Sequence, residues 1–504
     1  MKDFVSFIKN ISKEEFIRFW AEVSILIYKN HLQDNNGNEI GGTINFPLKI
    51  LQAGFIKKTI PVMISAWDIS DMAYTSICVS NDYRREHMTN DIAGTVTNLY
   101  RGYENAKPGS EYIREAALAD VYKYLMGMTY EQFRFQNLSW TLQNFNRNYH
   151  MMVASDKINR NDIINIKEII QKKFEMGIDE LLATELIILW LCSQHPDPLS
   201  APEELYIGKV SKIVSKQKIE QIIKYYTINY QQVRDSKIKK QIFYSKPFVK
   251  TQKSKAVLMV SLHLLQMSFV DSLYWLERDY YLNNGLGQAF INNFGEMFED
   301  YFEELAELYL SCDMWNKITE NKNKSADYYI EFNNVMFLFE LKSGIMGIGA
   351  KQQTPDVKQI DKFYSRNIRE AYEQLIVSEQ VYQYKNKPIV KVFLLYEFAN
   401  NTQLMMASIP DIFEEDPNSY ILSIADLEMF LVTYKQDKEK FQEVINELLK
   451  EKEKGDNDCF LEILNRHGAI GNIHFIGERD YFGQMLKKLY ADSGEDINYE
   501  KTRR

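Results

Sequence analysis

The stretch Asp327-Tyr-Tyr-Ile-Glu-Phe-Asn-Asn-Val-Met-Phe-Leu-Phe-Glu340-Leu-Lys342 carries more structural information than any other part of this 504-residue chain. Apolar and aromatic residues dominate it, and Asn333-Asn334 stands at its centre. Asparagine tolerates the positive φ angles of a two-residue hairpin turn, so the stretch predicts two antiparallel strands. A turn at these two asparagines places Asp327 directly opposite Glu340.

Two carboxylates at opposed positions of a hairpin repel each other, and a shared divalent cation would remove that repulsion. Lys342 follows Glu340 by two residues and therefore projects from the same face of the strand. The strand is apolar on both faces, as in a sheet interior, where an unpaired Glu or Lys is costly. Oxygen ligands that hold Mg²⁺, beside a lysine that orients water and stabilises phosphoryl oxygens, are the groups that phosphodiester hydrolysis requires.

An Asp, a hairpin and then Glu-x-Lys on the second strand resemble the PD-(D/E)xK superfamily of restriction-type nucleases. The resemblance covers roughly residues 285–435, and it departs from the pattern where Ala326 replaces the usual proline. It implies a metal site for Mg²⁺, with Mn²⁺ as a substitute. The residues that it implies for catalysis or metal binding are Asp327, Glu340, Lys342, the main chain of Leu341, Glu299 in Gly295–Tyr301, and Gln374 in Ala371–Leu375.

Each of these positions also has a plain structural interpretation. The hairpin could lie on the surface with an incidental Glu340–Lys342 pair. Glu299 lies on an acidic helix, and Gln374 could be an ordinary exposed helix residue. Arg366 and Arg369 on the helix that leads to Gln374 could contact phosphates or face solvent.

The bulk composition indicates packed cores, because 45% of the residues are apolar and 13% are aromatic. No apolar run is long enough to span a bilayer, and the N-terminus lacks the pattern of a signal peptide. The four cysteines are widely separated, as is typical of reduced thiols. These features favour a cytoplasmic protein without a membrane partner.

The net charge of −9 hides a basic segment between Tyr206 and Lys255, where thirteen Lys or Arg residues and two acidic residues give a local charge of +11. Such a segment can bind phosphate backbones, and Lys237, Lys239 and Lys240 are its candidate contacts. Four tyrosines among the lysines suit nucleic-acid stacking, or else they are core residues beneath a solvated helix face: Tyr225, Tyr226, Tyr230 and Tyr244.

The expected fold class is a multidomain α+β or α/β chain. We expect a mostly helical recognition or regulatory unit at 1–200, a basic connecting region at 206–284, the nuclease unit at 285–435 and a small helical or mixed region at 436–504. Helices are expected at 14–29 (opened by a Ser12/Glu15 capping box), 111–128, 130–153, 162–173, 179–192, 295–310, 362–384 and from 426. Strands are expected at 241–249, 256–261, 326–342 (as a hairpin), 389–396, 404–409 and 420–424.

These observations favour a Mg²⁺-dependent endonuclease that acts on DNA. Two alternatives stay open at this level: a ribonuclease of the same fold, and a non-cleaving nucleic-acid-binding scaffold. A large helical half beside a compact nuclease resembles the layout of bacterial anti-phage effectors. Residues 1–200 could then sense a signal, form a homo-oligomer or bind a partner protein.

Overall fold

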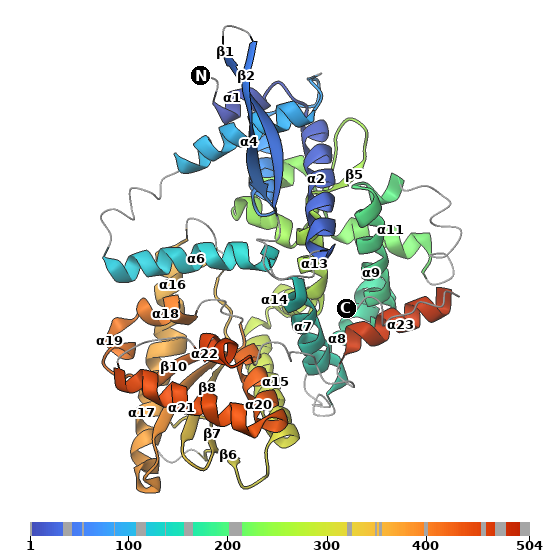
Figure 1. Cartoon of the computed structure of the whole chain (residues 1–504). Helices are drawn as coiled ribbons and strands as arrows, with labels where there is room; N and C mark the ends of the chain where they lie inside the picture. The colour runs from blue at the N-terminus through green and yellow to red at the C-terminus, as the bar shows by residue number, and fades with distance from the viewer. Residues whose placement is uncertain are drawn as a thin grey trace.

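The computed structural model describes residues 3–33, 43–52, 55–84, 86–106, 117–136, 138–155, 165–200, 214–319, 325–347, 350–351, 355–397, 402–454, 460–468 and 480–493. In these residues helices dominate the N-terminal half, and the largest sheet lies in the C-terminal half (Figure 1). The expected coarse class, a mixed α/β chain with a mainly helical first half, is confirmed.

A long β-hairpin near the N-terminus was not predicted. Pro47 and Pro61 interrupt its alternation of apolar and polar residues, and they lie opposite each other in the ladder. Prolines are tolerated there because each strand of a two-stranded sheet keeps a free edge. Ser12 caps the next predicted helix, since its Oγ accepts a hydrogen bond from Glu15 N–H at 3.2 Å. The elements are α1 (Phe4–Ile8), α2 (Lys13–Gln33), β1 (Thr43–Gln52), β2 (Phe55–Ser65), α3 (Asp68–Val79) and α4 (Asn90–Asn105).

The helices predicted between 111 and 192 are present with shifted ends, and residues 111–116 and 162–164 lie outside the described residues. Their apolar positions recur at helical spacing and form part of the larger core. The elements are α6 (Leu118–Gln136), α7 (Leu138–Tyr149), the π-helical η1 (His150–Ala154), α8 (Ile166–Phe174), α9 (Ile178–Gln194) and η3 (Pro198–Ser200).

The basic segment packs into the cores on both sides of it. Phe243 shares a core with Trp20 and Tyr100, whereas Phe248 belongs to the larger core with the C-terminal sheet. Only the end of the predicted strand 241–249 is extended, and its start is a 3-10 turn. The elements are α11 (Lys216–Tyr225), β3 (Thr227–Asn229), α12 (Tyr230–Asp235), η5 (Lys239–Tyr244), β4 (Phe248–Lys250), β5 (Val257–Met259), α13 (Leu262–Val270) and α14 (Ser272–Asn283), with sheet order β3-β4-β5.

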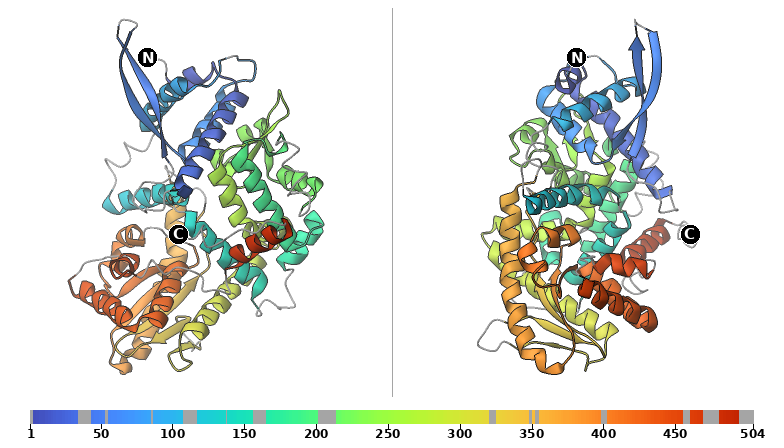
Figure 2. Two further views of the ribbon diagram at one scale, coloured as in Figure 1. Left: turned by 45° about the vertical axis from the view of Figure 1, so that its right-hand side comes forward. Right: turned by 60° about the vertical axis from the view of Figure 1, so that its left-hand side comes forward.

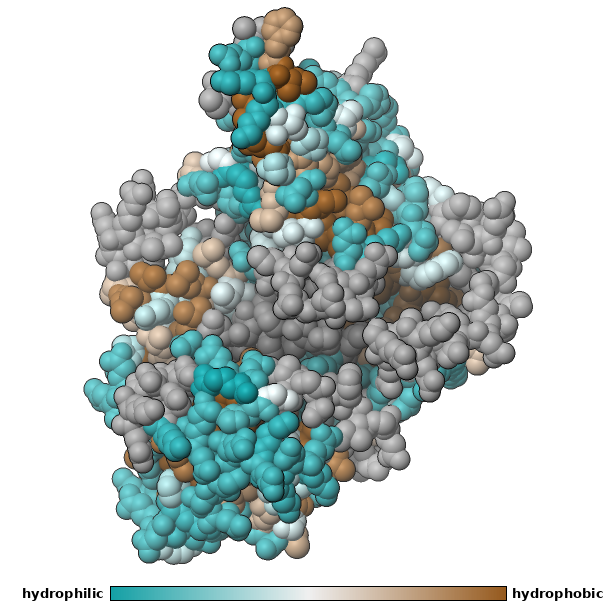
Figure 3. All heavy atoms as spheres, viewed as in Figure 1, coloured by the Kyte–Doolittle hydropathy of each residue, from teal (hydrophilic) through white to brown (hydrophobic). Residues whose placement is uncertain are grey.

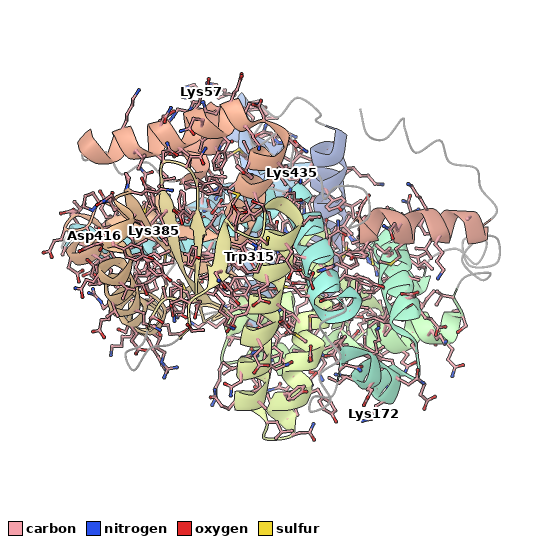
Figure 4. All side chains as sticks on the ribbon, turned by 90° about the horizontal axis from the view of Figure 1, so that it is seen from below. Lys57, Lys172, Trp315, Lys385, Asp416 and Lys435 are labelled. Atoms are coloured by element: carbon pink, nitrogen blue, oxygen red, sulfur yellow. The ribbon has the colours of Figure 1, made fainter. Side chains whose placement is uncertain are left out.

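The C-terminal sheet has five strands in the order β10-β9-β8-β7-β6. The strand β7 runs antiparallel to both of its neighbours, while β8, β9 and β10 are parallel. Figure 4 shows this sheet from below, with Trp315 of β6 and Asp416 before β10 labelled. The elements are α15 (Gly287–Tyr309), β6 (Trp315–Lys317), β7 (Tyr328–Glu331), β8 (Met336–Lys342), α16 (Val357–Tyr364), η7 (Ser365–Arg369), α17 (Glu370–Tyr382), η8 (Gln383–Lys385), β9 (Ile389–Leu395) and β10 (Ser419–Ser423).

One predicted strand is wrong. Residues 404–409 belong mostly to the helix α18 (Thr402–Ala407), because Leu-Met-Met-Ala is a run of strong helix formers that buries Met405 and Met406. Within the charged stretch 435–456, which was predicted to separate two units, the helix over 438–454 places Phe441 and Leu448 in the larger core. The remaining elements are α19 (Pro410–Phe413), α20 (Ile424–Gln436), α21 (Lys438–Lys454), α22 (Phe460–Arg466) and α23 (Tyr481–Ser493).

The helix α6 joins the N-terminal half to the loop that leaves β8. A Cβ atom on Gly127 would lie 2.6 Å from Pro355 Cβ and 2.8 Å from the Ala350 carbonyl oxygen, so helix and loop touch closely. Lys123 Nζ also lies 2.7 Å from Asp361 Oδ1 in α16. Close packing therefore connects the helical half to the segment that follows the candidate site.

Candidate active site at the end of strand β8

The hairpin β7–β8 has the register that the sequence predicts. Ile330 lies opposite Phe337 and Tyr328 opposite Phe339, and Phe332 N–H donates to the Val335 carbonyl at 2.9 Å to close the turn. The paired register ends at Tyr328. Asp327, the residue before it, donates its N–H to the Phe339 carbonyl at 3.0 Å, so it lies beside the end of β8 but outside the regular ladder.

One face of the hairpin rests on α15. The ring of Phe302 lies 4.6 Å from that of Tyr328 and 5.3 Å from that of Phe339, measured between centroids. Side chains alternate along a strand, so Glu340 lies on the other face from Phe339. On that other face Lys391 of β9 reaches α17, with its Nζ 2.7 Å from Glu379 Oε1. Packing of the aromatic face thus turns Glu340 and Lys342 toward the side of α17.

Glu340 and Lys342 form an ion pair at the end of β8. Lys342 Nζ lies 2.7 Å from Glu340 Oε1, and Glu340 is only 2% exposed. Among the described residues, the other carboxylate oxygen of Glu340, Oε2, has no hydrogen-bond partner although it is buried. A buried acceptor without a partner is costly, and a bound cation would satisfy it.

Asp327 lies beside this pair. Its Oδ2 accepts a hydrogen bond of 2.7 Å from the N–H of Leu341. The N–H and the carbonyl of one strand residue point to the same neighbour, and β7 begins only at Tyr328. The Leu341 carbonyl therefore points past the end of β7, on the side of Asp327. Two carboxylates and one main-chain oxygen are available at this place.

Electrostatics distinguishes these carboxylates from ordinary surface acids. Burial, followed by the charge of Asp327, raises the pKa of Glu340 to about 8, against the opposing effect of Lys342. Burial also raises the pKa of Asp327 to about 6, although its hydrogen bond from Leu341 N–H opposes the rise. Glu299 contributes to both increases. Without a cation Glu340 thus keeps its proton at neutral pH, and its contact with Lys342 is then a hydrogen bond to a neutral carboxyl group.

Glu299 is paired with a lysine that the sequence analysis did not single out. Lys317 Nζ on β6 lies 2.7 Å from Glu299 Oε2, and both side chains are partly exposed. The pair lies close enough to the site that the charge of Asp327 helps to raise the pKa of Lys317. The three-residue strand β6 has no recognisable pattern, so nothing in the sequence pointed to Lys317.

Gln374 on α17 reaches the segment that enters the site. Its Nε2 donates a long hydrogen bond of 3.4 Å to the Ser325 carbonyl, and Ser378 Oγ accepts a bond of 2.8 Å from Ala326 N–H. These contacts support the backbone just before Asp327. The sequence analysis also missed Ser378, because an isolated serine on a helix gives no signal.

The arginines and lysines that were predicted to contact nucleic acid lie at several different places on the protein. Arg366 is exposed on η7, and Arg369 donates to Asp411, with its NH2 3.0 Å from Oδ1. In the basic segment, Lys237 and Lys239 are exposed. Lys240 instead pairs with the buried Glu131 at 2.6 Å, so this ammonium is already engaged within the fold.

Two of the four tyrosines singled out in the basic segment are core residues. Tyr226 and Tyr230 are buried in the two hydrophobic cores. Tyr225 and Tyr244 are partly buried. Buried rings cannot stack on bases, so Tyr226 and Tyr230 are core residues, and stacking remains a prediction only for the other two.

The oxygen donors at this place suit a divalent cation, but a complete set of metal-binding side chains is not already gathered there. The described residues hold no group of three or more His, Cys, Asp or Glu side chains gathered for a metal ion. Asp327 and Glu340 supply only two such side chains, and the third donor would be the Leu341 carbonyl. The unpartnered Glu340 Oε2 and the hard oxygen donors suit Mg²⁺ or Mn²⁺.

No family model, curated protein or solved structure matches this chain. None of the described helices combines the length and the hydrophobicity needed to cross a bilayer. The three described cysteines, Cys78, Cys192 and Cys312, form no disulfide, and Cys459 lies outside the described residues.

Glu340→Gln is expected to stabilise the metal-free protein at pH 8 by about 1 kcal/mol or more, with little effect at pH 5. Folded Glu340 keeps its proton up to about pH 8, whereas the unfolded chain releases it at the ordinary value of 4.5. Between these values the folded state binds more protons, so the stability of the wild-type protein falls as the pH rises. A glutamine side chain does not titrate, so the substitution removes this fall in stability with rising pH. Thermal unfolding in EDTA at both pH values measures the difference.

Glu331→Gln is the matched control at the other end of the hairpin. Hydrogen bonds from Lys387 and Lys385 lower the pKa of Glu331, so its charged form stabilises the fold. This substitution should therefore destabilise the protein at pH 8. The same effect of Glu340→Gln at pH 5 and at pH 8 would contradict the raised pKa.

Proposed function

We propose that this chain is a Mg²⁺-dependent nuclease of the PD-(D/E)xK type that hydrolyses phosphodiester bonds of DNA. The observation that carries the proposal is the buried Glu340, with one oxygen bound to Lys342 and the other without a partner among the described residues, beside the Asp327 carboxylate. A purely structural ion pair would not require a second, half-buried carboxylate beside it.

The arrangement of the elements supports the proposal. The helix α15 precedes the hairpin, α17 follows β8, and the next strand β9 lies parallel to β8. This is the order that the resemblance implies for a restriction-like fold. Glu299 and Gln374, the two helical positions that the resemblance adds, both lie near Asp327 or the segment before it.

Each residue has a role that follows from its position. Asp327, Glu340 and the Leu341 carbonyl would hold the cation, which when bound lowers the pKa of water and stabilises charge on the phosphate. Lys342 would orient the attacking water or hold a phosphoryl oxygen, because its ammonium lies at the exposed edge of the pair. Glu299 would add negative charge beside the cation, and Gln374 would position the strand that carries Asp327.

A second function is favoured by one observation. The described residues hold no preformed group of three metal-binding side chains, which suits a nucleic-acid-binding scaffold that does not cleave. We also propose a role in defence against phage. Its one support is the layout of the chain, in which a large helical half is joined to a compact unit built on a sheet.

Incubation of the wild-type chain with supercoiled plasmid, linear DNA and RNA, each with Mg²⁺, Mn²⁺ or EDTA, tests the proposal. We expect cleavage that requires a divalent cation and that falls to background in Asp327→Asn. Cleavage of RNA alone would make the chain a ribonuclease. If the chain cleaves neither DNA nor RNA and calorimetry detects no binding of Mn²⁺, the non-cleaving scaffold would be the function that the results support.

A further inference from the structure

The hairpin β1–β2 forms a ribbon that projects from the body of the molecule at the opposite end from the five-stranded sheet (Figures 1 and 2). Its strands have 10 and 11 residues, so the ribbon is about 30 Å long. A shift of register between Ile50 and Leu51 leaves Lys57 as the extra residue of a β-bulge. Bulges increase the twist of a ribbon and redirect side chains.

The base of the ribbon is firmly attached. A Cβ atom on Gly94 of α4 would lie 2.0 Å from the Pro47 carbonyl oxygen, so helix and strand are in direct backbone contact. Phe46 packs against Trp20 of α2 with 5.7 Å between ring centroids. Lys49 forms an ion pair with Asp91 at the start of α4. These contacts fix the orientation of the ribbon relative to α2 and α4, as a docking element requires.

The distal part of the ribbon is exposed and carries positive charge only. Residues 43–65 contain three lysines and no acidic residue, in a chain whose net charge is −9. Phe55 is 80% and Ile56 56% exposed, and apolar side chains are visible on the ribbon in Figure 3. Exposed polar side chains lie near them in the distal part of the ribbon: Gln52, Lys57, Lys58 and Thr59.

The proline, the positive charge and the exposed polar side chains of the ribbon indicate which class of partner it binds. Pro61 in β2 and the neighbouring lysines discourage edge-to-edge pairing with another strand. The charge selects a polyanion. Exposed amide and hydroxyl side chains can hydrogen-bond base edges, whereas they have no use in a lipid bilayer. A two-stranded ribbon fits the major groove of B-form DNA, which is about 12 Å wide, but not the narrow major groove of A-form RNA.

We propose that the β1–β2 ribbon docks in the major groove of duplex DNA. Lys57 and Lys58 bind phosphates, and Gln52 and Phe55, which are paired and therefore share one face of the ribbon, lie against the base edges. The proposal deepens the proposed function, on which it rests for the identity of the substrate, by assigning duplex DNA rather than RNA. Because the ribbon and the candidate site lie at opposite ends of the molecule, the preferred substrate is a long duplex.

Binding is measured in an Asp327→Asn background, so that the result does not depend on cleavage. The probes are fluorescent 20- and 60-base-pair DNA duplexes and an RNA duplex of 20 base pairs, titrated at several salt concentrations. Lys57→Glu/Lys58→Glu should weaken DNA binding at least tenfold, and Phe55→Ser should weaken it less. Lys57→Ala/Lys58→Ala should reduce the slope of log K against log salt by about 2, one unit for each phosphate contact.

Lys167→Glu/Lys172→Glu is the matched control, because both lysines are exposed on α8, outside the ribbon and outside the basic segment 206–255. The control should bind DNA like the Asp327→Asn parent. Equal affinity of the ribbon variants and the parent would overturn the proposal. So would ribbon-dependent binding of phosphatidylserine vesicles in place of DNA.

Failure of the two proposals gives different results. If the chain binds DNA through the ribbon but cuts no nucleic acid, the ribbon proposal stands and the nuclease proposal fails. If plasmid is cut with Mg²⁺ and the ribbon variants bind and cut as well as the wild-type chain, the ribbon proposal alone fails.

Discussion

A Lys342→Met variant should cleave plasmid DNA at least about a hundredfold more slowly than the wild-type chain, while still binding Mn²⁺. The reason is the position of the ammonium, 2.7 Å from Glu340 Oε1 and at the edge of the buried carboxylates. Methionine keeps the length of the side chain but removes the charge that would orient water or stabilise a phosphoryl oxygen. Asp327 and Glu340 remain, so the donors for the cation are unchanged.

Initial rates of plasmid nicking and calorimetric titration with Mn²⁺ separate the two effects. Lys385→Met is the matched control, because Lys385 pairs with Glu331 at 2.9 Å at the far end of the same hairpin. It should cleave at the wild-type rate. Thermal unfolding of both variants shows whether a lost rate reflects a lost fold. Wild-type cleavage by a folded Lys342→Met would remove the lysine from the mechanism.

The register of the hairpin could be predicted because it depends on local chemistry. Placing the turn at Asn333-Asn334 sets the register, and every pair on the two strands then follows from counting, including Tyr328 opposite Phe339. The reason for the turn was wrong, because neither asparagine adopts the positive φ that suggested it. The proximity of Asp327 and Glu340 needs no information from distant parts of the chain. For the same reason, the strand β9 and the helix α15 could be predicted from their own apolar patterns.

The errors arose where tertiary context or an interrupted pattern decides the structure. The ribbon β1–β2 escaped notice because Pro47 and Pro61 break its alternation, and only a two-stranded sheet accommodates them. Residues 404–409 looked like a strand by hydrophobicity, but their helix propensity prevails. Lys317 reaches Glu299 from a strand of three residues, a contact made by folding rather than by spacing.

Contacts between the two halves could not be predicted from the sequence either, and one of them is a buried charge pair. Arg147 on α7 is fully buried and donates two hydrogen bonds to Glu428 on α20, from Nε at 2.7 Å and from NH2 at 2.8 Å. Tyr301 on α15 donates to the same carboxylate at 2.8 Å. One ion pair thus connects the helical half to two helices that pack beside the C-terminal sheet.

Arg147→Met is therefore expected to destabilise the protein by about 3–5 kcal/mol, because it leaves the Glu428 carboxylate buried without its cation. Urea unfolding followed by circular dichroism measures the loss. Arg466→Met is the control, since Arg466 pairs with Glu447 on a more exposed surface, where an ion pair contributes about 1 kcal/mol or less.

The double variant Arg147→Met/Glu428→Gln distinguishes a buried charge from lost packing. If the uncompensated carboxylate causes the destabilisation, removing its charge should restore at least about half of the lost stability, a coupling that independent sites do not show. If the two substitutions simply add, the pair acts through side-chain volume alone. Recovery of stability would identify Arg147 as the residue whose charge makes the contact between α7 and α20 stable, and through it the attachment of the helical half to the sheet that carries Asp327 and Glu340.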